Sequence, residues 1–211
     1  MTVPRGEPDQ AACLTCGTPL PGGPGLRCAH CGRWLGAPLA IELTAAAVTA
    51  LLIGRFGAQP AVAAFGYLGV LGVALAQVDG AVQRLPDRLT LPAYPAVLVL
   101  LALAAVASRD PAALVRALLG GLALGAAYLA LGLLSGGQLG GGDVKLAGLL
   151  GLVLGWSGWP VLIAGACLGF FLAALTGIAL LATRRITRHA ALSFGPFMLT
   201  GALIALVAAS S

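Results

Sequence analysis

Residues 159–182 read WPVLIAGACLGFFLAALTGIALLA, and this run contains no charged side chain. A helix needs about 20 apolar residues to cross the hydrocarbon core of a bilayer, so the run is long enough to span a membrane. Apolar runs of similar length recur along the chain, and they determine the fold class. On this measure we expect about seven membrane-spanning helices, near residues 39–57, 60–78, 90–108, 112–134, 143–157, 159–182 and 193–209.

The overall composition agrees with a membrane protein. Of the 211 residues, 59% are hydrophobic and 9% are charged, whereas a soluble domain carries about a quarter charged residues. The formal net charge of +5 comes from Lys and Arg near the ends of the apolar runs. No basic patch is interleaved with aromatic residues, so we expect membrane lipid and no nucleic acid as a partner. The sequence predicts an all-α polytopic membrane protein.

The polar segment 1–37 carries two cysteine pairs, Cys13-Leu14-Thr15-Cys16 and Cys28-Ala29-His30-Cys31, each followed by glycine. Paired cysteines with this spacing are typical of a structural zinc ion with four thiolate ligands. Two disulfides in an oxidising compartment are the alternative. We therefore predict a zinc knuckle over residues 1–37 and a transmembrane domain over residues 38–211. The remaining Cys167 lies in an apolar run and is expected to be a small packing residue.

The distribution of basic residues predicts the orientation, because cytoplasmic segments carry an excess of Lys and Arg. With a cytoplasmic N-terminus and seven spans, the C-terminus lies outside and the cysteines lie in a reducing compartment, which favours zinc over disulfides. The outside loops then hold only Arg55 and Arg109. The inside segments hold Arg5, Arg27, Arg33, Arg84, Arg88, Lys145, Arg184, Arg185 and Arg188.

Two of the few carboxylates fall at the ends of expected spans. Asp79 ends the second span and Asp143 begins the fifth, and two complete crossings lie between them. Both aspartates are therefore expected at the same membrane face. Paired carboxylates suit acid–base hydrolysis of a peptide bond, in which an ionised group activates water and a protonated group polarises the carbonyl or protonates the leaving amine. The alternative is two unrelated helix-end residues, each solvated at the interface.

Three glycines, Gly140, Gly141 and Gly142, precede Asp143. Glycine has no Cβ, so it allows a sharp turn and a close approach of another backbone. Such a turn beside a carboxylate would admit an extended substrate. The alternative is a polar loop in which Asp143 caps the following helix.

Three segments together resemble the bacterial prepilin peptidases, also called type IV leader peptidases. Residues 78–92, VDGAVQRLPDRLTLP, are similar to the first signature of that family. Residues 140–146, GGGDVKL, look like the second signature, which is the GxGD motif followed by Lys-Leu. Residues 193–197, SFGPF, are similar to the segment that opens the last helix of the family.

The resemblance implies a membrane-embedded aspartic protease with Asp79 and Asp143 as its catalytic pair and no cofactor for the peptidase chemistry. Asp87 matches a position with a structural or supporting role, and we expect Lys145 to support the site as well. The implied substrates are type IV prepilins or pseudopilins of type II secretion, cut at the cytoplasmic face of the bacterial inner membrane. A relative that acts on another pilus system fits the same motifs.

Many members of this family also N-methylate the new N-terminus with S-adenosylmethionine, and they carry an apolar helix before the four-cysteine segment. This sequence has no apolar span before Cys13, so the resemblance implies the peptidase more firmly than the methyltransferase. A transporter or scaffold with a zinc-knuckle interaction domain is the competing function. A transporter usually places its charges near the bilayer midplane, and the span-end positions of Asp79 and Asp143 count against it.

Overall fold

The computed structural model describes residues 38–82, 87–134, 140–183 and 194–209. These ranges contain seven helices and no strand, which confirms the predicted all-α fold. The helices are α1 (Pro38–Phe56), α2 (Val62–Val82), α3 (Asp87–Ser108), α4 (Pro111–Leu134), α5 (Gly141–Ser157), α6 (Trp159–Ala182) and α7 (Gly195–Ala208). The four-cysteine segment lies outside the described residues.

The helix bounds follow the apolar runs to within about four residues, and α3 begins at Asp87 where residue 90 was expected. Helix α2 continues to Val82, so Asp79 lies within its last turn rather than at its end. Residues 80–82 contain no proline, and the single glycine, Gly80, weakens a helix without ending it. Pro86 disfavours helical backbone at the residue before it, which lies beyond Val82. The shortest of the described helices is α7 with 14 residues, whereas the sequence led us to expect α5, which has 17. Pro196 lies in the first turn of α7, where proline costs no helical hydrogen bond, and it marks the start of this helix.

Three of the described helical segments are long and apolar enough to cross a membrane: Thr90–Ser108, Pro111–Leu134 and Trp159–Ala182. Two shorter apolar segments, Val62–Gln77 and Gly195–Ala208, lie beside them. The chain is therefore a multi-pass membrane protein. Its surface agrees, because large apolar side chains such as Val106, Leu134 and Ile178 are 78%, 85% and 66% exposed.

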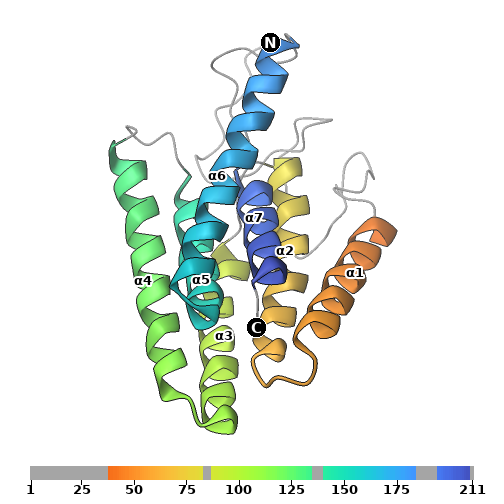
Figure 1. Ribbon diagram of the computed structural model, residues 1–211. Coiled ribbons are helices and arrows are strands. Elements are labelled where there is room, and N and C mark those ends of the chain that lie inside the picture. Colours follow the sequence, from red (N-terminus) through yellow and green to blue (C-terminus); the bar gives the residue numbers. More distant parts are fainter. Residues whose placement is uncertain (1–37, 83–86, 135–139, 184–193, 210–211) are drawn as a thin grey trace.

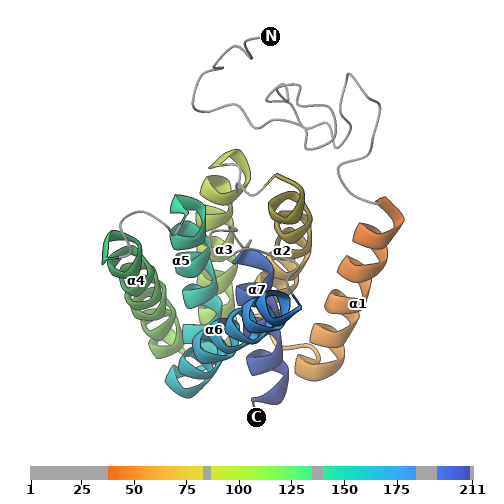
Figure 2. The same ribbon diagram turned by 90° about the horizontal axis from the view of Figure 1, so that it is seen from above.

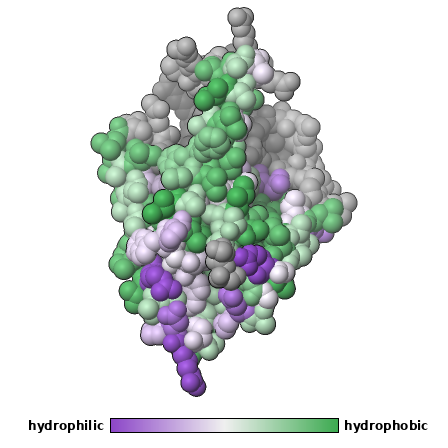
Figure 3. All heavy atoms as spheres, in the orientation of Figure 1, coloured by the Kyte–Doolittle hydropathy of each residue, from purple (hydrophilic) through white to green (hydrophobic). Residues whose placement is uncertain are grey.

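The visible face of the molecule is mostly apolar (Figure 3), and its hydrophilic residues gather toward the end at which α3 connects to α4. Cys167, which was expected to be a small packing residue, is exposed on α6 among the described helices. A cysteine is apolar enough to face lipid as readily as a helix partner.

The helices run up and down in a bundle with α5 at its centre (Figures 1 and 2). Helix α5 contacts α3, α4, α6 and α7, and all residues from Leu146 to Gly155 are buried. By contrast, α1 stands at the edge of the bundle and packs mainly on α2. A helix that is buried on every side needs no polar face, which explains why the apolar run of α5 shows no periodic pattern.

Small residues allow α4 and α5 to approach closely in antiparallel order. A Cβ added to Gly151 would lie 2.4 Å from the carbonyl oxygen of Gly120, and one on Gly155 would lie 2.7 Å from the carbonyl oxygen of Arg116. Gly125 faces Gly148 further along the same contact. Glycine spacing of this kind brings helix backbones together in lipid, where van der Waals contact replaces the hydrophobic effect as the driving force.

Close packing through glycines also joins α6 to α7. A Cβ on Gly201 would lie 2.4 Å from the backbone nitrogen of Gly169 and 2.9 Å from the carbonyl oxygen of Gly165. At the C-terminal end of α7, Arg55 of α1 donates from Nε to the Val207 carbonyl at 3.0 Å. The same guanidinium also donates to the Ala209 carbonyl. An arginine that satisfies the last carbonyls of a helix complements the negative end of its dipole.

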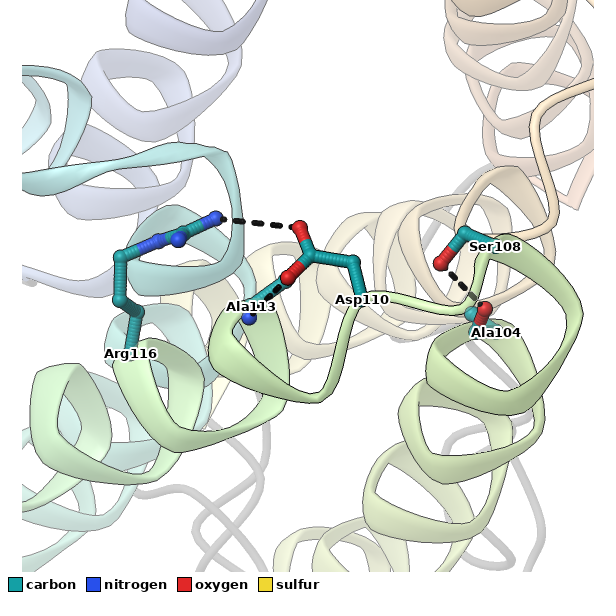
Figure 4. A network of polar contacts seen from close by, with 5 residues as sticks. All are labelled: Ala104, Ser108, Asp110, Ala113 and Arg116. Atoms are coloured by element: carbon teal, nitrogen blue, oxygen red, sulfur yellow. Dashed lines mark hydrogen bonds and ion pairs between the residues drawn. The ribbon is translucent and has the colours of Figure 1, made fainter.

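The α3–α4 turn shows how the sequence sets a tight connection (Figure 4). Arg109 adopts φ 54°, and the Asp110 amide donates to the Ala105 carbonyl at 3.1 Å, as in a Schellman motif. Asp110 then caps α4, because its Oδ1 accepts from the Ala113 amide at 3.0 Å, and its Oδ2 lies 3.7 Å from Arg116.

Candidate functional site

Asp143 is the third residue of α5 and is partly buried. The N-cap of this helix is Gly140, which adopts φ −65° and ψ 139°. A Cβ added to Gly140 would lie 3.5 Å from Oδ2 of Asp143, so the carboxylate folds back over the N-cap. Asp143 therefore lies in the first turn of the central helix, where the helix dipole favours a negative charge.

Asp79 lies in α2, three residues before its last residue, Val82. The side chains of residues 78–89 lie outside the described part of the structure, so Asp79 is placed by its helix. Helix α2 ends and α5 begins at the same end of the bundle (Figure 1). The two aspartate-bearing helix ends therefore lie at one end of the molecule, as the count of crossings predicts.

Helices α3 and α7 each contact both α2 and α5, and they set the separation between the two aspartate-bearing helices. An apolar pocket of about 190 Å³ lies between α1, α2, α5 and α7. It is lined by Val73 and Ala76 of α2, by Leu150 and Val153 of α5, and by further apolar residues. The pocket begins about one helical turn from Asp79.

Packing against the described residues does not require glycine at positions 140 and 141. A Cβ on Gly141 would meet nothing within 4 Å, and one on Gly140 would meet only Oδ2 of Asp143 at an ordinary contact distance. Neither residue has positive φ. Among the described residues, therefore, only the Asp143 carboxylate faces Gly140, and none comes within 4 Å of a Cβ placed on Gly141.

Two tyrosines that belong to none of the motifs lie close to the N-terminal half of α5. The Tyr94 hydroxyl donates to the Lys145 carbonyl at 2.7 Å. Tyr128 is 3% exposed and lies within electrostatic reach of Asp143. The chain has only three tyrosines, and this scarcity in so apolar a sequence was the signal that could have identified them.

Tyr128 belongs to an aromatic cluster with Phe170 of α6 and Phe194, the N-cap of α7. The ring centroids lie 5.3 Å apart for Tyr128 and Phe170, and 5.1 Å apart for Phe170 and Phe194. The cluster brings α4, α6 and the start of α7 together. It gives the SFGPF segment a structural role, since Phe194 and the following Gly195-Pro196 fix the beginning of α7 at this end of the bundle.

The other predicted site residues are distributed as follows. Lys145 is partly buried in α5, and Asp87 is the first residue of α3, with a side chain outside the described part. Cys13, Cys16, Cys28 and Cys31 lie outside the described residues as well. Within the described ranges, no group of His, Cys, Asp and Glu side chains could hold a metal ion.

Residues 65–182 match the type IV leader peptidase family, and this match includes both aspartates and the glycine run. The chain belongs to the type IV leader peptidase family. It is 37% identical over 180 residues to a prepilin leader peptidase/N-methyltransferase of Burkholderia pseudomallei, covering 83% of this chain and 56% of the relative.

Two further relatives carry the same description. The chain is 40% identical over 157 residues to that of Dickeya chrysanthemi, covering 71% of this chain and 52% of the relative. It is 30% identical over 186 residues to that of Pseudomonas aeruginosa, covering 87% of this chain and 62% of the relative. The chain thus spans a little more than half the length of these leader peptidases. No solved structure matches it.

Proposed function

We propose that this chain is a membrane-embedded aspartic endopeptidase that removes the leader peptide of type IV prepilins or pseudopilins. The family match over residues 65–182 carries the proposal, because it includes Asp79 and Asp143 on helix ends that share one end of the bundle. Membership in a peptidase family also argues against the competing transporter or scaffold function.

The two helix ends suggest different roles for the two carboxylates. Asp143 lies at the positive end of the α5 dipole, which stabilises an ionised carboxylate, whereas Asp79 lies at the negative end of the α2 dipole, which disfavours one. We assign to Asp143 the removal of a proton from the attacking water. We assign to Asp79 the donation of a proton to the leaving amine. Lys145, Asp87 and the three glycines support this pair.

We propose that all seven helices cross the bacterial inner membrane, with the N-terminus inside and the C-terminus outside. This orientation puts Arg55 and Arg109 at the outer end and both aspartates at the cytoplasmic face. A prepilin is already held in the membrane by its apolar helix, and its leader is cut just before that helix on the cytoplasmic side. The proposed catalytic end and the cleavage site then lie at the same depth.

Co-expression of the chain with a prepilin tests the proposal directly. The expected result is a mature pilin that lacks its leader, detected by mass spectrometry of the membrane fraction. A pilin that retains its leader, in cells where the chain is inserted in the membrane, would overturn the assignment. The same spectrum shows whether the new N-terminus also gains a methyl group from S-adenosylmethionine, the second activity named for the relatives.

Replacing Gly141 by alanine is expected to slow leader removal roughly 10-fold to 100-fold without lowering thermal stability. The added Cβ meets no described residue within 4 Å. We propose that a substrate backbone approaches Asp143 along this stretch, and a displacement of that backbone by about 1 Å costs rate on this scale. The rate and the thermal midpoint in detergent are measured together.

Gly54→Ala is the matched control, because a Cβ on Gly54 of α1 also meets nothing within 4 Å and lies at the other end of the bundle. Its rate should equal that of the unmodified chain. Equal rates for Gly141→Ala and Gly54→Ala would contradict the proposed approach of substrate along the glycine run.

We further propose that residues 1–37 form a zinc knuckle in which Cys13, Cys16, Cys28 and Cys31 hold one structural ion, while residues 38–211 form the peptidase domain. The four thiolates suit tetrahedral zinc, and the paired spacing supports it.

Changing Cys13 or Cys28 to serine should reduce the bound zinc to below about half of one equivalent, measured on the purified chain by elemental analysis. The control is Cys167→Ser, which should keep its metal. Full zinc content in the Cys13 and Cys28 variants would contradict the assignment.

A further inference from the structure

The hydroxyl of Tyr94 joins α3 to the beginning of the central helix. It donates to the carbonyl oxygen of Lys145 at 2.7 Å, across 51 positions of sequence. A carbonyl oxygen has two lone pairs, so the Lys145 carbonyl accepts this bond in addition to its place in the helical ladder of α5. The contact lies two residues after Asp143.

Gly148 provides the space that admits this hydroxyl. A Cβ added to Gly148 would lie 2.2 Å from Oη of Tyr94 and 3.2 Å from Cζ, and the three nearest atoms all belong to Tyr94. The recess and the hydrogen bond therefore form one fitted contact between α3 and α5.

The first turn of α5 is rich in glycine. Its N-cap is Gly140, which makes no side-chain capping bond, and Gly141 and Gly142 follow. Each glycine in a helix costs about 1 kcal/mol relative to alanine, because its backbone loses more freedom on folding. Contacts with other helices can stabilise a turn of this composition. The Tyr94 hydrogen bond provides such a contact at Lys145, two residues after Asp143.

We propose that Tyr94 is a positioning residue, whose hydroxyl, seated against Gly148 and bonded to the Lys145 carbonyl, holds the start of α5 so that Asp143 projects in its productive direction. The proposal rests on the proposed peptidase function. Tyr94 acts through the backbone of α5 and takes no part in the bond-breaking step.

Tyr94→Phe removes the hydroxyl and keeps the ring. We expect kcat for leader removal to fall about fivefold to tenfold with KM unchanged, since one hydrogen bond of ordinary strength is lost. Tyr67→Phe, at a 38% exposed tyrosine of α2, should leave both constants unchanged. Equal kcat for the Tyr94→Phe variant and the unmodified chain would overturn the proposal.

A double variant tests the fitted contact itself. Gly148→Ala alone should lower kcat more than Tyr94→Phe does, because its Cβ displaces the hydroxyl. In the Tyr94→Phe/Gly148→Ala chain the closest clash is gone, and kcat should return to within about twofold of Tyr94→Phe alone. A double variant whose loss equals the product of the two single losses would show independent sites and contradict the proposal.

Hydrogen exchange separates this inference from the proposed function. In the intact protein in detergent, Tyr94→Phe should speed amide exchange over residues 144–149 about fivefold, whereas Tyr67→Phe should not. If the unmodified chain fails to process a prepilin, the peptidase assignment falls, and the exchange rates alone decide whether Tyr94 holds the start of α5. Unchanged exchange over residues 144–149 would overturn the positioning role in either case.

Discussion

Replacing Asp143 by asparagine is expected to lower the rate of leader removal by at least about 10³-fold, because the amide cannot take a proton from water. Asparagine has nearly the same shape and suits the first turn of a helix, so α5 should begin at the same residue. The measurement is the initial rate of prepilin cleavage in detergent, with thermal midpoints for every variant. Asp79→Asn should show a loss of similar size, since both members of the pair are needed.

Asp110→Asn is the matched control for both aspartate variants. Asp110 lies in the α3–α4 turn, at the end of the bundle opposite the start of α5. Asparagine keeps the N-cap of α4 and loses only the exposed contact with Arg116 at 3.7 Å, which is worth little. This variant should cleave at the normal rate. Cleavage at the normal rate by either Asp79→Asn or Asp143→Asn, with normal membrane insertion, would remove that residue from the catalytic pair.

The second large effect is expected at Gly151, in the contact between α4 and α5. An added Cβ would lie 2.4 Å from the Gly120 carbonyl oxygen and 2.8 Å from the Gly121 Cα, so both obstacles are backbone and no side chain can rotate away. Helices α4 and α5 must separate, and we expect Gly151→Ala to cost about 3 kcal/mol of stability. For a chain of this size, that loss corresponds to a thermal midpoint lower by roughly 5–10 °C.

A glycine-to-alanine substitution at a position with no close neighbour should not lower stability. Gly177 lies in α6, and a Cβ there meets nothing within 4 Å. Gly177→Ala should therefore leave stability unchanged or raise it by up to about 1 kcal/mol, because alanine is the better helix former. Thermal midpoints of both variants are compared in one detergent. An unchanged midpoint for Gly151→Ala would mean that the α4–α5 contact is looser than described.

Hydropathy alone predicted the helices well. The run 112–134 corresponds to α4 at Pro111–Leu134, and the run 159–182 coincides with α6 at Trp159–Ala182. Such runs are informative because a membrane span must be apolar over its whole length and must satisfy its backbone internally. The ends were less certain, because a charged residue does not by itself stop a helix, as the continuation of α2 past Asp79 to Val82 shows.

The motifs identified the candidate catalytic residues, Asp79 and Asp143, and the crossings between them put both at one end of the bundle. The sequence could not identify Tyr94 or Tyr128 as their neighbours. Tyr94 meets Lys145 across 51 positions, and no local pattern reports such a contact. Side-chain neighbours of this kind depend on how the helices pack, which the apolar composition of every run leaves open.

By itself the sequence determined an all-α membrane protein, the approximate bounds of its helices and the candidate catalytic residues, because length, hydropathy and short motifs are local properties. Only the tertiary structure decided which helix is central. The run 143–157 is apolar like its neighbours, yet in the bundle α5 is buried from Leu146 to Gly155 by contacts with α3, α4, α6 and α7. The physical reason is that glycines of α5 have no side chain, so that Gly151 and Gly155 let the backbone of α5 pack directly against Gly120 and Gly121 of α4. This packing holds the helix that begins with the turn of Asp143.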